Sequence, residues 1–225
     1  AERAVAMAKL APADPNAGLA EPGQLATEFP ALDLADDSEP TSDELLAMAN
    51  EADAAGLAVA GVTASTGAGA SASRTLVVLG ASNGFSGNYQ RTGYGVSAAM
   101  IGGDGTKMER DYDYSSKVHF ADLVSPQEIG RSAGKRVVKR LNARKVSSKA
   151  VPVVYDQRIA GSLVGHLAGA VNGAGVARGT SFLKDQLGEA VFAKGIYIVD
   201  DAHMARGHSS KPFDAEGLAT GRLDI

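Results

Sequence analysis

The chain has 225 residues, of which 44% are hydrophobic and 21% charged, and its formal net charge at pH 7 is −4. This composition is typical of a soluble globular protein, and no run approaches the ~18–20 uninterrupted apolar residues of a membrane-spanning helix. Cysteine is absent, which excludes disulfides and thiolate metal sites from this sequence. Together with the lack of a basic-then-apolar signal at the start, these features predict a cytoplasmic protein with no membrane partner.

The first part of the chain predicts two helices separated by irregular structure. Residues 4–10 have an amphipathic pattern, and the Pro- and Gly-rich residues 11–31 predict an irregular connector. Residues 32–34 are expected to form a short edge strand. A capping box at Thr41-Ser42-Asp43-Glu44 then predicts a helix that ends near Gly56.

After this helix the pattern changes to that of strands. We expect an antiparallel meander of about four strands, at residues 57–63, 74–79, 93–101 and 108–114. The sequence Gly102-Gly103-Asp104-Gly105 is a hairpin signal between the last two. Residues 63–73 are rich in Ala, Ser, Gly and Thr and are interpreted as low-complexity sequence.

A second capping box, Ser125-Pro126-Gln127-Glu128, predicts a further helix with proline at its first position. The basic residues 142–149 follow as a linker. The expected boundary lies there, between an α+β domain at residues 1–145 and a second domain at residues 146–225. The second domain is expected to open with a buried strand at residues 151–155.

Residues 156–173 predict a helix with Asp156 as its N-cap. One half of the helical wheel is apolar: Ile159, Ala160, Leu163, Val164, Leu167, Ala168 and Val171. His166 lies at the rim of this half, four residues after Ser162. A buried helix with one histidine at its edge is the simplest interpretation. A Ser–His nucleophile pair is an alternative, but no third group or oxyanion donor is identifiable.

This helix and its surroundings resemble the TldD/PmbA family, the "modulator of DNA gyrase" proteins, and specifically its PmbA (TldE) branch. The TldD branch carries an H-E-x-x-x-H zinc-peptidase helix at this place. Here Gly161 stands for the first histidine, Ser162 for the glutamate and His166 for the second histidine. Such a helix needs two imidazoles for zinc and a carboxylate base for water. These three residues are therefore degenerate motif positions, and we assign no catalytic or metal-binding residue.

The resemblance implies an antiparallel sheet with flanking helices, followed by the start of a β-rich, barrel-like C-terminal domain. Further matches to the PmbA branch lie at residues 12–20, 83–89, 110–114 and 211–217. Family members are longer and the match covers their middle, so we expect a chain truncated at both ends.

For function, the resemblance implies a PmbA/TldE-type subunit of a heteromeric metalloprotease that acts on unstructured peptides. A TldD-type partner would hold the zinc and carry out hydrolysis, and a homo-oligomer is also possible. One alternative is a regulatory protein that acts on DNA gyrase or a toxin–antitoxin system without peptidase activity. Another is a self-sufficient peptidase.

Charge is unevenly distributed along the chain. Residues 10–73 hold eleven acidic and no basic residues, whereas residues 131–149 hold eight basic residues and no acidic ones. A solvated helix face and linker is the simpler interpretation of the basic run, because there is no nucleic-acid-binding motif and no cluster of aromatic residues to stack on bases. We therefore expect no direct nucleic-acid partner. A metal site at His203 and His208 with Asp200-Asp201 is a further alternative that lacks clear additional ligands.

Overall fold

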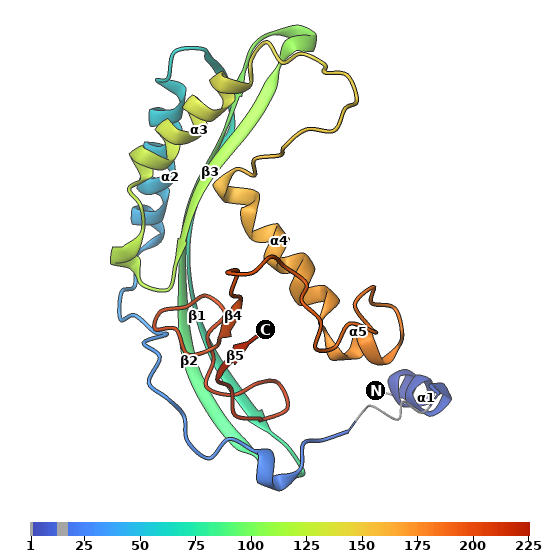
Figure 1. Ribbon diagram of the computed structural model, residues 1–225. Helices are drawn as coiled ribbons and strands as arrows, with labels where there is room; N and C mark the ends of the chain where they lie inside the picture. The colour runs from blue at the N-terminus through green and yellow to red at the C-terminus, as the bar shows by residue number, and fades with distance from the viewer. Residues whose placement is uncertain (1, 13–17) are drawn as a thin grey trace. The chain divides into compact units, whose positions relative to one another are not determined.

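The computed structural model describes residues 2–12 and 18–225, so residues 13–17 of the expected connector lie outside the described residues. The chain divides into two compact units (Figure 1). Unit 1 comprises Ala1–Ala143 and Asp201–Arg222, and unit 2 comprises Arg144–Asp200 and Leu223–Ile225. The expected α+β fold is confirmed. None of the described helices is long and apolar enough to span a membrane.

Unit 1 is built on a three-stranded antiparallel sheet of order β1-β2-β3. Its strands are β1 (Val62–Gly80), β2 (Ser86–Gly102) and β3 (Glu109–Lys117). The expectation of about four strands was wrong, because residues 63–73 are not a break but the first part of β1, which continues through the strand expected at residues 74–79. These small residues pair through their backbones with residues of β2, for example Ser71 with Gly95.

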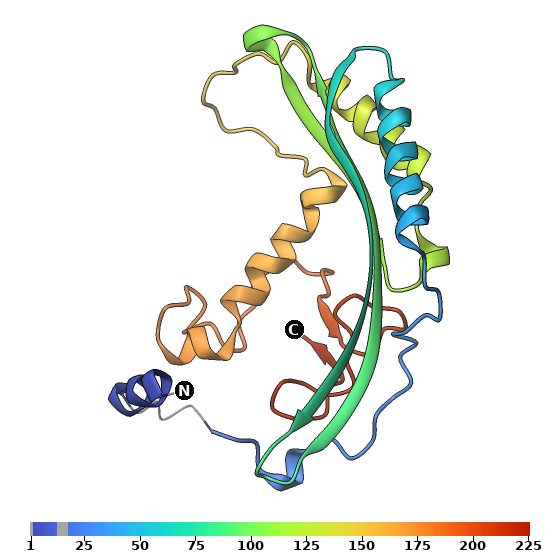
Figure 2. The ribbon, with the colours of Figure 1, turned by 180° about the vertical axis from the view of Figure 1, so that it is seen from behind.

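Helices α2 (Ser42–Leu57) and α3 (Pro126–Arg140) lie side by side on one face of this sheet (Figure 2). The first capping box is confirmed, since the Glu44 amide donates to Thr41 Oγ1 and the Thr41 amide donates to Glu44 Oε2. In the second helix the Ser125 hydroxyl accepts from the Glu128 amide. The other described helices of unit 1 are α1 (Glu2–Leu10), η1 (Pro22–Gln24), η2 (Gly105–Lys107) and η3 (Phe120–Asp122).

The main core of unit 1 lies between these two helices and β2. Its buried members are Ala52, Val96, Ala98, Met100, Ile129, Ala133 and Val137. The helices approach closely because both carry small residues at the contact. A Cβ built on Gly130 would lie 1.9 Å from the carbonyl oxygen of Ala52, and one on Gly56 would lie 2.2 Å from Met100 Cε. Glycine is thus required at position 130, where the clash is with the backbone of α2, whereas at position 56 the clash is with the flexible end of the Met100 side chain.

The other face of the sheet is covered at its hairpin end by residues 201–222, which we call the strap. Phe213 of the strap is buried against Phe85 and Tyr89, with ring centroids 5.0 and 5.3 Å away. Phe29, from the segment before α2, completes the cluster at 5.3 Å from Phe213. The strap comes late in the sequence, beyond the expected boundary at residue 145, yet it packs within unit 1. That boundary stays a prediction.

Unit 2 contains α4 (Gln157–Ala170) and α5 (Gly173–Ala177), and β4 (Val199–Asp201) pairs with β5 (Arg222–Asp224). The buried strand expected at residues 151–155 was wrong, because this segment is irregular and exposed and pairs with no described strand.

The expected burial of the apolar half of α4 was also wrong. Only Leu167 and Ala170 of this helix are buried, whereas Ile159, Leu163 and Val164 are about half exposed. The barrel-like architecture expected for the second domain remains a prediction.

Candidate functional site

The three degenerate motif positions lie on α4, which begins after Asp156, whose Oδ1 accepts from the Arg158 amide at 3.0 Å. The helix is regular throughout, so residues five apart point about 140° away from each other. Gly161 and His166 therefore do not converge on one point. Ser162 donates its hydroxyl to the Ile159 carbonyl within the same helix at 2.6 Å, and His166 is exposed.

This arrangement does not fit a zinc ion. A zinc site needs three or four converging ligands, and His166 is the single imidazole on α4, with open space at Gly161. Across residues 2–12 and 18–225, no group of three or more His, Cys, Asp or Glu residues is arranged to hold a metal. We assign no catalytic step to α4.

The alternative pair of histidines is directed elsewhere. His203 Nε2 lies 3.1 Å from Thr220 Oγ1, and His208 Nε2 lies 2.7 Å from the Ser116 carbonyl oxygen. The His203 ring thus contacts another residue of the strap and the His208 ring contacts the end of β3, and the structure does not bring the two rings together as ligands.

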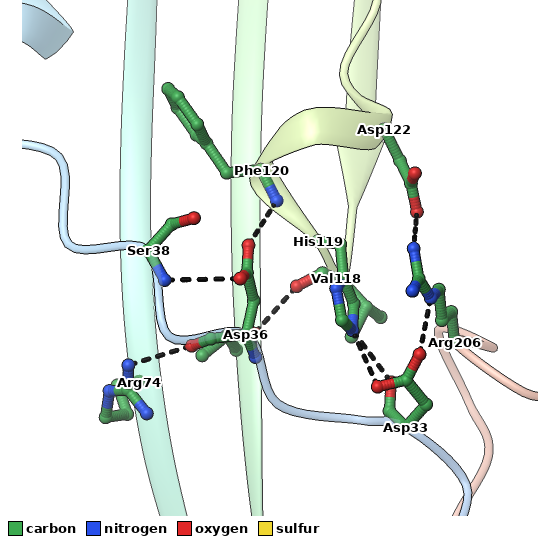
Figure 3. Close-up of polar contacts among 10 residues, drawn as sticks. Asp33, Asp36, Ser38, Arg74, Val118, His119, Phe120, Asp122 and Arg206 are labelled. Atoms are coloured by element: carbon green, nitrogen blue, oxygen red, sulfur yellow. Dashed lines mark hydrogen bonds and ion pairs between the residues drawn. The ribbon is translucent and has the colours of Figure 1, made fainter.

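A cluster of charged side chains lies where three distant segments of unit 1 meet (Figure 3). Arg206 of the strap donates from Nε to Asp33 Oδ2 at 2.6 Å and from Nη1 to Asp122 Oδ2 at 3.0 Å. His119 Nε2 lies 3.2 Å from Asp33 Oδ1 and 3.1 Å from the Asp33 carbonyl oxygen. We call Asp33, His119, Asp122 and Arg206 the polar junction. The hydrogen bond from Arg206 lowers the pKa of Asp33 and, in return, raises the pKa of Arg206.

The polar junction also explains why no edge strand forms at residues 32–34, where one was expected. Asp33 has a left-handed backbone with φ of 51°, which interrupts an extended run. The carbonyl of Leu32 accepts from the Arg206 amide and that of Leu34 accepts from the Thr92 amide. The segment is therefore fixed by two different partners and not by one neighbouring strand.

Asp36 anchors the loop between β3 and α3 beside the polar junction. Its Oδ2 accepts from the Phe120 amide at 2.7 Å, and its Oδ1 accepts from the Ser38 amide at 3.2 Å. These bonds to the ionised form, chiefly that from Phe120, lower the pKa of Asp36. The Asp36 amide in turn donates to the buried Thr92 hydroxyl, which donates to the Val118 carbonyl.

We expect an Asp36→Asn variant to be less stable than the wild type at neutral pH and equally stable in acid. The folded-state pKa of Asp36 is lowered, so the carboxylate stabilises the fold above its unfolded pKa of 3.8 and loses this effect as the pH falls through the lower folded value. Melting temperatures measured from about pH 7 to pH 2 should show the gap closing below about pH 4. A gap that stays constant with pH would contradict this role.

The half of the sheet face that the strap leaves uncovered is lined by very small residues. It forms a shallow groove of about 430 Å³ between β1 and β3. Tyr112 and Tyr114 of β3 stand beside it with nearly parallel rings, 6.2 Å apart. Beyond the groove, the outer edge of β1 between residues 66 and 79 makes no backbone hydrogen bond to another described segment. This edge can accept a further strand.

Two domain models of one family match the chain. Residues 35–141 match the PmbA/TldA metallopeptidase central domain, and residues 148–225 match the C-terminal domain of the same family. The Metalloprotease PmbA of Escherichia coli O157:H7 and the PmbA homolog of Haemophilus influenzae are each 34% identical over 225 residues. Both alignments cover all of this chain and 50% of the relative.

Solved structures show the same fold. A putative modulator of DNA gyrase from Bacteroides thetaiotaomicron superposes with a TM-score of 0.90 at 26% identity, over 100% of this chain and 52% of that one. TldE from Thermococcus kodakarensis superposes with a TM-score of 0.76 at 20% identity, over 99% of this chain and 50% of that one.

The fold and the two matched domains define a chain of the type described as PmbA/TldA metallopeptidase domains, with an α+β central domain. The chain belongs to the PmbA/TldD family, as its sequence resemblance indicated, and it spans about half the length of the curated relatives it matches.

Sequence reasoning found α4 but missed the polar junction. Its members come from positions 33, 119, 122 and 206, and no local pattern links residues so far apart. The one related signal in the sequence was the excess of acidic residues before residue 73. It does not indicate which basic side chains pair with them.

Proposed function

We propose that this chain is a PmbA/TldE-type subunit of a heteromeric zinc metalloprotease that acts on unstructured peptides. In this proposal the TldD-type partner supplies the zinc and the catalytic residues, and this chain helps to hold the substrate. The observation that carries the proposal is α4, where Gly161 and Ser162 replace a metal ligand and a base and where His166 is solitary and exposed. Membership of the PmbA/TldD family supports it.

The sheet of unit 1 supports the part of the proposal that concerns substrate. A free strand edge binds an extended peptide through main-chain hydrogen bonds, which gives affinity with little dependence on sequence. The outer edge of β1 carries a single charged residue, Arg74, and no proline between Val62 and Gly80. Apart from Arg74 and the register shifts before residue 68, this edge has few of the features that prevent strand addition. Substrates without secondary structure are those that can pair in this way.

The test is hydrolysis of an unstructured peptide by the full-length protein, alone and mixed with an H-E-x-x-x-H partner, with and without chelator. We expect chelator-sensitive activity only in the mixture. Chelator-sensitive activity of this protein alone would instead support a self-sufficient peptidase. Stable binding to gyrase or to an antitoxin in the absence of the partner, without hydrolysis in any mixture, would support the regulatory alternative.

A His166→Ala variant tests whether His166 takes part in the hydrolysis by the mixture. Because His166 is exposed and its neighbours offer no second ligand, we expect the activity of the mixture to change less than about twofold on substitution, well short of the loss that follows removal of a catalytic group. Replacing the motif glutamate of the partner is the matched control and should abolish activity. A comparable loss in both variants would show that His166 takes part in the chemistry.

A further inference from the structure

The two halves of the strap are held in different ways. The later half is anchored by Phe213, which is 2% exposed inside the aromatic cluster, and by the Gly217 carbonyl, which accepts from the Ala26 amide at 2.8 Å. The earlier half, residues 203–210, is held mainly by polar contacts at the surface. Burial of a large aromatic side chain is strongly stabilising, so the later half is firmly attached to the sheet.

Arg206 provides the main contacts of the earlier half through its two ion pairs in the polar junction. The side chains of Arg206, Asp33 and Asp122 are 45%, 48% and 40% exposed. Exposed ion pairs contribute little to stability and are weakened by salt. Asp33 and Arg206 also both adopt left-handed backbone conformations, with φ of 51° and 56°, which are unfavourable for residues with a side chain. The attraction of the ion pairs is thus partly offset by backbone strain at the same residues.

The remaining contacts of this half are also polar, and they include the bond from the Arg206 amide to the Leu32 carbonyl. Arg91 of β2 donates to the carbonyl oxygens of Gly207 and His208, and the His208 ring contacts the Ser116 carbonyl at the end of β3. No large apolar side chain of residues 203–210 is buried, since Met204 is 60% exposed. The small side chain of Ser210 is buried and marks the transition to the anchored half.

We propose that residues 203–210 form a lid that opens and closes over the part of the sheet around Arg91 of β2 and the end of β3. The anchored residue Phe213 is the fixed end of this lid. The polar junction is the latch of this lid, and ionic strength controls the latch because its ion pairs are exposed. Opening uncovers the Arg91 guanidinium and the end of β3, and so lengthens the uncovered face of the sheet. The lid follows from unit 1 alone and does not depend on the proposed peptidase role.

Hydrogen exchange of the full-length protein, read by mass spectrometry, tests the lid. An Arg206→Ala variant should exchange about tenfold faster than the wild type at residues 203–210 and 31–34, with protection at residues 213–219 unchanged. Raising NaCl from about 0.05 to 1 M should speed exchange of the same residues in the wild type and have little further effect in the variant.

Lys211→Ala is the matched control, because it removes a positive charge from the strap at an exposed side chain with no ion pair in the described structure. It should leave exchange at residues 203–210 unchanged. Arg206→Lys should lie between wild type and alanine, because an ammonium cannot make the two directed contacts of a guanidinium. Unchanged exchange in Arg206→Ala would overturn the latch. Equal acceleration of both halves would overturn the lid, because the strap would then leave as one piece.

Discussion

A Gly130→Ala variant is expected to lose about 3 kcal/mol of unfolding free energy, at the upper end of what overpacking costs. The added methyl would lie 1.9 Å from the Ala52 carbonyl oxygen and 2.9 Å from the Gly56 amide nitrogen. Both are backbone atoms of α2, so no side chain can rotate away, and α2 and α3 must move apart. That movement opens the core around Met100, the largest fully buried side chain of the sheet. Urea denaturation followed by far-UV circular dichroism measures the loss.

Gly165→Ala is the matched control for this prediction. Gly165 also lies inside a helix, but a Cβ there meets no atom within 4 Å. The same substitution should therefore stabilise α4 by about 0.5–1 kcal/mol through helix propensity alone, which slower hydrogen exchange of α4 would report. Destabilisation by both variants would show that glycine content, and not the contact between α2 and α3, governs the effect.

A Phe213→Ala variant is expected to destabilise unit 1 by about 3–5 kcal/mol. Phe213 is buried among Phe29, Phe85 and Tyr89, and its removal leaves a cavity between these three rings, which come from two separate chain segments. Chemical denaturation gives the magnitude, and hydrogen exchange should show protection lost across the whole strap and the β1–β2 hairpin end.

The exposed Phe182 serves as the control for Phe213. Its side chain is 80% exposed, so Phe182→Ala should change stability by less than about 0.5 kcal/mol. A loss below about 1 kcal/mol for Phe213→Ala would contradict the role of this residue as the anchor of the strap.

The elements that could be predicted from the sequence are those with local signals. The starts of α2 and α3 were predicted correctly, because the residues that cap a helix lie only three apart in the sequence; the full capping box forms at α2, and at α3 the Ser125 side chain accepts from the Glu128 amide. The strand length of β1 could not be predicted in the same way. Its middle consists of Ala, Gly and Ser residues, which give no hydrophobic alternation, and it is extended because β2 pairs with it.

The environment of α4 shows a second limit of sequence reasoning. An apolar stripe predicts that one side of a helix favours burial, but it does not say what covers that side. Ile159, Leu163 and Val164 form such a stripe and are nevertheless about half exposed. The degenerate positions Gly161, Ser162 and His166 were placed on α4 by their resemblance to a motif, which is chemical information that the hydrophobic pattern does not contain. The polar junction had no comparable motif.

The position of the strap late in the chain has a consequence for how the protein is made. The ribosome completes the central sheet and α3 well before Phe213 is synthesised, so Phe29, Phe85 and Tyr89 lack their central partner during that interval. At about 5–20 residues per second the delay is on the order of several seconds. The nascent chain thus carries an uncovered aromatic surface beside the free edge of β1, a combination that invites aggregation or chaperone binding. Premature termination between α3 and the strap would make that state permanent.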